Sequence, residues 1–128
     1  MSTLRSPLGR ARGLGSAKDG VHHFWVQRVS ALALIPLSLW FVFSIAKLAT
    51  GAADFEAVRW WVSAPSVAVT LVLFLAATLY HSLLGVQVVI EDYVSHEGAK
   101  LAALVLSKFL HVIVGVSAIF AVLKVALG

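Results

Sequence analysis

Cysteine is absent from this sequence of 128 residues. No disulfide, thiolate nucleophile, or cysteine-held zinc ion or iron–sulfur cluster can therefore form within the chain. Charged residues are also scarce, at 12% of the chain against about 25% in a typical soluble protein. There is no Ser-His-Asp arrangement, phosphate-binding glycine loop or metallohydrolase motif, so we expect no catalytic residue for hydrolysis in this chain alone.

Apolar residues take the place of the missing charges. They make up 60% of the chain, and the mean hydropathy is +0.95, which is more apolar surface than a soluble domain of this size buries. About 20 apolar residues span the roughly 30 Å of a bilayer core as a helix. Three runs have this length, so we predict an all-α membrane protein with spans at about 29–49, 66–90 and 101–127.

Two prolines and a tryptophan pair mark the ends and interruptions of these spans. Pro36 lies inside the first span and predicts a kink. Pro65 suits the start of the second helix, because proline is tolerated in a first turn. Between them, residues 50–64 regain polarity and contain Trp60 and Trp61, which predicts a short connection with an aromatic anchor at the membrane surface. A compact polar loop, residues 91–100, is predicted before the third span.

Basic residues are concentrated ahead of the first span. Residues 1–20 form a predicted basic arm, and residues 21–128 a predicted membrane domain. The composition of the arm also resembles a mitochondrial transit peptide, but a cytoplasmic arm explains it equally well. The net charge of +4 is interpreted as a topology signal and not as a nucleic-acid site. We therefore expect the amino terminus on the cytoplasmic side, or on the matrix side in an organelle, and the carboxyl terminus on the opposite side, which in a bacterium is the periplasm. The first connection has only one basic residue, Arg59. Five basic residues precede the first span: Arg5, Arg10, Arg12, Lys18 and Arg28.

His81 is the one ionisable side chain in the middle of the second span. Two interpretations stay open for it: ligation of a haem iron through a ring nitrogen, or an interhelical hydrogen bond. Gly85 follows one turn later on the same helix face, where it allows either a flat cofactor or another helix to approach closely. His111, on the third span with Lys108 three residues before it, is the second candidate ligand.

A polar pair closes the second span. Asp92 lies roughly 16 Å beyond His81 along the helix axis and nearly in line with it. Tyr93 follows and offers a phenolic donor at headgroup level. The pair suits the binding and protonation of a polar-headed, lipid-soluble substrate, although a helix-end carboxylate and an interfacial tyrosine explain it as well.

Several polar side chains lie at the entrance to the first span. Arg28 is either a topology-setting charge or, if haem is present, a partner for a propionate, with the Ser30 hydroxyl nearby. His22 and His23 are interfacial; either serves similarly or is a solvated histidine, and adjacent residues on a helix do not face the same way.

Two motifs resemble the D-type hydrophobic anchor subunit of succinate dehydrogenase, respiratory complex II. The first is a G-V-H-x-F segment followed by an arginine before the first span: Gly20, Val21, His22, Phe24 and Arg28. The second is a histidine, a glycine four residues on, and Asp-Tyr-Val at the end of the same helix: His81, Gly85, Asp92, Tyr93 and Val94.

The resemblance implies a function for the chain as part of an enzyme complex of the respiratory chain and tricarboxylic acid cycle. It implies that His81 is an axial ligand of haem b, shared with a C-type, cytochrome b556-like anchor subunit. It implies that Tyr93, with Asp92, binds ubiquinone, and that Arg28, Ser30 and His22 lie near the haem propionates. The iron–sulfur and flavoprotein subunits would be tethered on the cytoplasmic face, with no FAD or iron–sulfur cluster in this chain. The three spans would pack with the C-type subunit into a helical bundle in a bacterial inner membrane.

Two alternatives remain at this point. An anchor of a fumarate reductase, or another membrane cytochrome b, shares a mid-membrane histidine but differs in the direction of electron flow. A cofactor-free membrane assembly or transport subunit uses the same three spans with His81 as a packing residue.

Overall fold

The computed structural model describes residues 6–8, 19–51 and 53–128, and its helices lie within these ranges. They are α2 (Asp19–Thr50), α3 (Phe55–Ser63), α4 (Pro65–Tyr93) and α5 (Glu97–Leu127). The described residues contain no strand. Three helices, α2 from Gly20 onward, α4 and α5, are long and apolar enough to cross a membrane. The prediction of an all-α, three-span chain is therefore confirmed.

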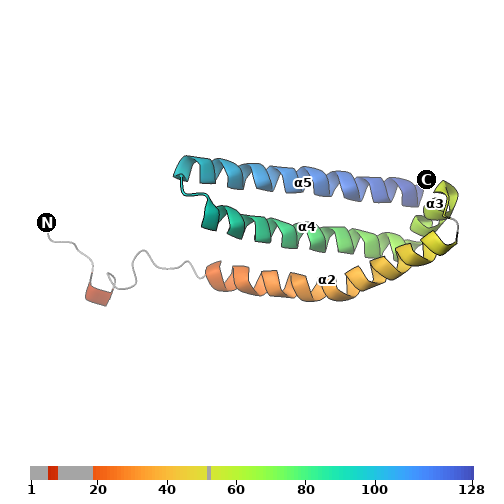
Figure 1. Cartoon of the computed structure of the whole chain (residues 1–128), viewed down its shortest axis with the longest axis horizontal. Coiled ribbons are helices and arrows are strands. Elements are labelled where there is room, and N and C mark those ends of the chain that lie inside the picture. The colour runs from red at the N-terminus through yellow and green to blue at the C-terminus, as the bar shows by residue number, and fades with distance from the viewer. Residues whose placement is uncertain (1–5, 9–18, 52) are drawn as a thin grey trace.

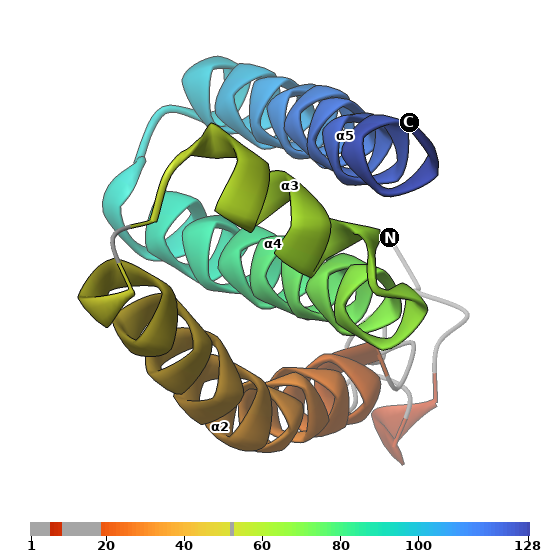
Figure 2. The same cartoon turned by 90° about the vertical axis from the view of Figure 1, so that its right-hand side faces the viewer.

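Helix α4 is the centre of the arrangement. It packs against both α2 and α5, and Figures 1 and 2 show it lying between them. The short helix α3 crosses one end of this layer and contacts α4 and α5. Helix α2 begins at the opposite end from the carboxyl terminus (Figure 1).

Helix α2 is longer than the predicted first span. It begins at Asp19, well before position 29, so His22, His23 and Arg28 are helical. Of the predicted arm, residues 1–20, only residues 6–8, 19 and 20 are described. Pro36 lies inside α2, and Figure 1 shows the helix bent along its length. The bend has a physical cause, because proline lacks the N–H for the helical hydrogen bond and its ring crowds the preceding turn.

The predicted connection at residues 50–64 contains a short helix, α3, which the sequence pattern did not indicate. Asp54 caps the helix by accepting a hydrogen bond from the Ala57 N–H at 2.8 Å, and Glu56 lies in the first turn, where a carboxylate favours the helix dipole. Phe55, Val58 and Val62 recur at helical spacing and line a groove with α5. Capping and this apolar face together stabilise the helix.

The polar loop is also shorter than predicted. Helix α4 continues to Tyr93 and α5 begins at Glu97, so only residues 94–96 connect them. Helix α5 is capped by His96, whose Nδ1 accepts from the Ala99 N–H at 3.3 Å. The span limits at 90 and 101 marked where the sequence turns polar, and polar side chains continue a helix beyond the bilayer core. The start at Pro65 is confirmed.

Aromatic stacking and a glycine contact hold the helices together. Phe41 of α2 stacks on Phe74 of α4 with ring centroids 5.0 Å apart. Between α4 and α5, a Cβ added at Gly115 would lie 3.3 Å from Leu79 Cδ1, so the absence of a side chain there permits the close approach.

Few side chains are buried inside this layer. Among the described residues, the buried apolar ones are Val62, Ala68, Leu71 and Leu84. Large apolar side chains such as Leu32 (66% exposed) and Phe120 (65% exposed) point outward. Lipid or another protein must cover this surface, because exposing so much apolar area to water would cost free energy.

Candidate functional site

His81 meets Ser30 where α4 packs against α2. The His81 Nδ1 atom lies 2.9 Å from the Ser30 Oγ atom. Ser30 is buried, at 8% exposure, and His81 is half-buried. This contact joins residues that are 51 positions apart in the chain, so the packing of α2 on α4 sets the orientation of the imidazole.

The hydrogen bonds of Ser30 determine which His81 nitrogen carries a proton. Ser30 Oγ–H donates to the Gln27 carbonyl oxygen at 2.9 Å. A hydroxyl has one proton, and a carbonyl oxygen only accepts. The Ser30 oxygen must therefore accept from His81, which places a proton on Nδ1. In the neutral ring, Nε2 then carries a lone pair, and it makes no hydrogen bond to any residue that the structure describes.

His111 has a different set of partners. Its Nδ1–H donates to the Ser107 carbonyl oxygen at 2.8 Å, and Nδ1 also lies 3.4 Å from Ser107 Oγ. Its Nε2 lies 3.2 Å from Ser82 Oγ, so it accepts from that hydroxyl. Both ring nitrogens are engaged, and the side chain links α5 to α4. Of the two predicted candidates, His81 alone has a free ring nitrogen within the described part of the chain.

The surface around His81 is open on one side. A Cβ added at Gly85 would meet nothing within 4 Å, so no other part of the described chain uses the space beside this glycine. A groove of about 300 Å³ also runs between α2 and α4 next to Ser30. Its lining is mainly apolar: Trp25, Val26, Val29, Ser30, Ala33 and Tyr80. A flat, largely apolar group is compatible with this surface.

The residues predicted around the haem propionates separate onto different faces of α2. Ser30 faces α4, whereas Arg28 is exposed and its guanidinium lies over the Phe24 ring, 4.4 Å from the centroid. Arg28 and Ser30 are two residues apart, which corresponds to a rotation of about 200° around the helix axis. His22 is exposed as well. Arg28 and His22 are therefore not brought together with Ser30.

Sequence reasoning gave His23 too little weight. This residue lies seven positions before Ser30 and so shares its face of α2. It lines a pocket of about 300 Å³ with Gly20, Gln87, Val88 and Glu91. Its Nε2 is buried without a hydrogen-bond partner among the described residues, and Gln87 Nε2–H donates to Glu91 Oε1 at 2.8 Å. The i, i+7 spacing was the available signal.

Asp92 and Tyr93 lie at the end of α4, as predicted, and both are exposed. The Tyr93 side chain is 84% exposed, and its phenol makes no hydrogen bond to the described residues. Both groups are available to a ligand or to another protein chain.

No group of three His, Asp or Glu side chains within residues 6–8, 19–51 and 53–128 is arranged to hold a metal ion. A metal at His81 therefore needs its remaining ligands from outside these residues. The His81 lone pair and the open surface beside Gly85 fit a haem, because His81 could hold its iron and the open surface would leave room for its flat ring.

The fold and these side chains define a multi-pass membrane protein with a mid-membrane histidine oriented by a serine. Comparison with known proteins identifies the family. The family model for the succinate dehydrogenase/fumarate reductase transmembrane subunit matches residues 2–123. The chain belongs to this family, and within it to the membrane anchors of succinate dehydrogenase.

Its relatives include two bacterial proteins that are similar over almost their full length. The succinate dehydrogenase hydrophobic membrane anchor subunit of Rickettsia bellii is 34% identical over 119 residues, covering 93% of this chain and 94% of the relative. The subunit of the same name from Paracoccus denitrificans is 31% identical over 123 residues, covering 96% and 93%. No solved structure gave a significant match.

Proposed function

We propose that this chain supplies His81 as an axial ligand to haem b in a succinate:quinone oxidoreductase. The observation that carries the proposal is the Ser30–His81 contact, which leaves the Nε2 lone pair free. Histidines that bind metals generally donate their other ring N–H to a fixed acceptor, and Ser30 is such an acceptor. A C-type, cytochrome b556-like anchor subunit would supply the opposite ligand and cover the surface beside Gly85. Haem b, when bound, would supply one-electron storage.

The chain's own residues would prepare this site. Ser30 accepts the hydrogen bond from Nδ1–H and so fixes the imidazole ring of His81. The lone pair of Nε2 then points away from the Ser30 hydroxyl. The apolar groove beside Ser30 excludes water, which lowers the local dielectric around a bound cofactor. Arg28, exposed at the entrance of α2, is available to a propionate that extends toward the membrane surface.

Tyr93 and Asp92 would form part of the ubiquinone site. Reduction of a quinone to a quinol consumes two electrons and two protons, one proton at each oxygen. The exposed Tyr93 phenol is placed to donate a hydrogen bond to one carbonyl oxygen, and the neighbouring Asp92 carboxylate to relay a proton from water. The iron–sulfur and flavoprotein subunits would dock on this side, tethered by the anchor.

We further propose a location in the bacterial cytoplasmic membrane. The basic residues before and at the start of α2 favour a cytoplasmic amino terminus, which places Tyr93 on the cytoplasmic side and the carboxyl terminus on the periplasmic side. The enzymatic activity would belong to the complex.

The ligand assignment is tested by spectra of the chain purified in mild detergent with the proteins that accompany it. We expect His81→Ala to remove or strongly alter the reduced-minus-oxidised band of a b-type haem. His111→Ala is the matched control and should keep the band, because both nitrogens of that ring already have partners. Loss of the band in His111→Ala alone would contradict the assignment, and no haem in the unmodified complex would favour a cofactor-free anchor.

The quinone assignment is tested by Tyr93→Phe. This change removes one hydrogen-bond donor and keeps the ring. We expect ubiquinone reduction by the complex to fall about tenfold or more, as is usual when a substrate-bound donor is lost. Succinate oxidation with a water-soluble artificial electron acceptor should be unchanged. Trp60→Phe, which removes an exposed aromatic N–H donor at the other end of the molecule, is the control, and an equal effect of both changes would count against a specific role for Tyr93.

A further inference from the structure

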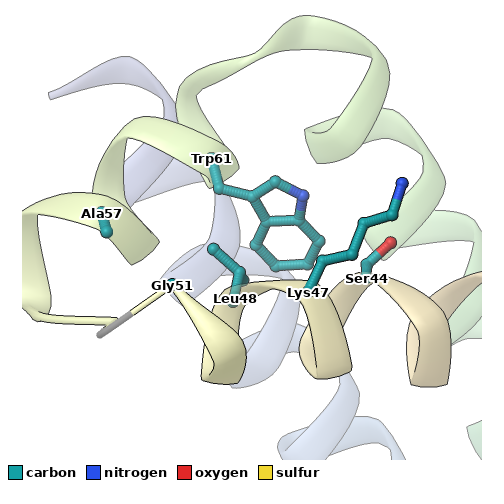
Figure 3. Close-up of a pocket in the computed structure, with 6 residues that line it drawn as sticks. All are labelled: Ser44, Lys47, Leu48, Gly51, Ala57 and Trp61. Carbon is teal, nitrogen blue, oxygen red and sulfur yellow. The ribbon is translucent and has the colours of Figure 1, made fainter.

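A second cavity lies at the end of α2 opposite from Tyr93. Its volume is about 380 Å³, and it lies between the last two turns of α2 and the helix α3. Figure 3 shows the residues that line it: Ser44, Lys47, Leu48, Gly51, Ala57 and Trp61. The functions proposed above make no use of it.

Three hydrogen-bond donors meet in this cavity. They are the Lys47 ammonium, the Ser44 hydroxyl and the Trp61 indole N–H. Figure 3 shows the Lys47 amine, the Ser44 hydroxyl and the indole nitrogen on the same side of the cavity. Trp61 also stacks on Trp40 with ring centroids 6.0 Å apart and an interplanar angle of 24°. This stacking fixes the indole in the cavity wall.

None of these donors has a partner among the residues that the structure describes. Within the part of the chain that the structure describes, the one ion pair joins Lys100 to Glu97 at 3.7 Å, and Lys47 takes no part in it. No carboxylate lines the cavity. The carboxylates nearest in sequence are Glu56, which is next to the lining residue Ala57, and Asp54, which accepts from the Ala57 N–H as the cap of α3. Neither of them lines the cavity. The cavity therefore combines a positive charge with neutral donors, which favours an anion.

The position in the membrane identifies the kind of anion. Lys47 lies in the last turn of a membrane-spanning helix, where a lysine reaches the headgroup level. Trp60, next to the cavity residue Trp61, is 82% exposed, as expected for an aromatic side chain at the membrane interface. Leu48 and the face of Trp61 make part of the wall apolar. A ligand with a phosphate and an attached apolar chain matches both kinds of lining.

We propose that this cavity binds the phosphate of a phospholipid headgroup. The Lys47 ammonium contributes the charge, the Ser44 hydroxyl and the Trp61 indole N–H donate hydrogen bonds to phosphate oxygens, and the acyl chains run along α2 toward the bilayer centre. This inference is independent of the haem and quinone assignments, because it uses none of their residues.

The test counts lipids bound to the full chain, purified in mild detergent with the proteins that accompany it. Native mass spectrometry follows the binding of added phosphatidylglycerol. We expect Lys47→Gln to weaken one binding step about tenfold, since a charge-assisted hydrogen bond is lost, and Trp61→Phe, which keeps an aromatic ring against Trp40, to weaken it about threefold. Lys47→Arg should retain the lipid. Circular dichroism of each variant checks that the helices are intact.

Lys124→Gln is the matched control, because Lys124 is an exposed lysine in the last turn of α5 that does not line the cavity. Equal lipid binding by Lys47→Gln and Lys124→Gln would overturn the proposal and leave Lys47 as a lysine that only reaches the bulk headgroups. A parallel titration adds inorganic phosphate from a concentration equal to that of the lipid up to a large excess. Failure of the excess to displace the lipid supports a lipid site, whereas displacement already at equal concentration would overturn the lipid as the occupant.

Discussion

Ser30 combines two contacts at one oxygen, a hydrogen bond within its own helix and a histidine of another helix. Ser63, Thr70 and Thr78 each donate to a carbonyl oxygen one turn back, and Ser30 does the same toward Gln27. Only the oxygen of Ser30 also lies next to a histidine of another helix among these four. A common local hydrogen bond thus determines the tautomer of His81.

Ser30→Ala should change the electronic properties of the proposed haem without removing its ligand. The N–H···O contact makes the imidazole a stronger electron donor, which favours oxidised iron. Its loss should therefore raise the midpoint potential of the haem. For a one-electron couple, the shift is about 60 mV for each tenfold change in the ratio of the imidazole's affinities for oxidised and reduced iron. Redox titration of the haem band measures the shift. Ser30→Thr, which keeps the hydroxyl, should stay near the unmodified value, and an unchanged potential in Ser30→Ala would argue against this contact.

The sequence predicted His81 but not its partner. A histidine in the middle of an apolar span is visible from the residues alone. The pairing with Ser30 depends on the rotation of α2 relative to α4, which the periodicity of two nearly uniform apolar helices does not determine. For the same reason the residues alone did not separate His22 from His23, and the resemblance pointed to His22, although His23 is the residue that faces α4.

At the scale of the helices, two glycines differ in whether another helix of this chain packs closely against them. Gly115 of α5 faces Leu79 of α4 closely, while the space beside Gly85 of α4 is open. The spans and the start of α4 at Pro65 followed from hydropathy and proline. Helix α3 did not, because its nine residues are too short for a strong periodic signal and depend on the Asp54 cap and on contact with α5.

The two glycines allow a matched comparison. Gly115→Val should destabilise the packing of α5 on α4 by about 1–3 kcal/mol, because the added side chain crowds Leu79. Gly85→Val meets no atom of the described chain, so it should leave thermal unfolding nearly unchanged while reducing haem content through the proposed cofactor surface. Thermal unfolding in detergent and haem per protein measure the two effects. A larger loss of thermal stability in Gly85→Val than in Gly115→Val would contradict this division.

At the scale of the whole molecule, the three spanning helices form a layer with apolar surface on its outside. Membership in a succinate dehydrogenase family implies a membrane and other subunits of a complex, and both are available to cover this surface. The two ends of the layer carry different chemistry: Asp92 and Tyr93 at one, and Lys47 with Trp61 at the other. The orientation of the chain in the membrane therefore decides which compartment each site faces.

The absence of cysteine makes that orientation simple to measure. Single cysteines are introduced as Ser95→Cys, between α4 and α5, and as Ala53→Cys, before α3. We expect a membrane-impermeant maleimide to label Ala53→Cys in intact cells with a permeable outer membrane, and to label Ser95→Cys only after the inner membrane is opened. The reverse pattern would place the amino terminus in the periplasm.

The three-residue connection between α4 and α5 also bears on the order in which the protein folds. A short loop costs little entropy to close, so these two helices are expected to associate as a hairpin while α2, separated from them by α3, docks afterward. The docking of α2 is the step that brings the Ser30 hydroxyl to His81. A cofactor that arrives early would meet an imidazole still free to rotate and exchange its proton between nitrogens, and only the finished membrane domain would present it with a ring fixed in one state.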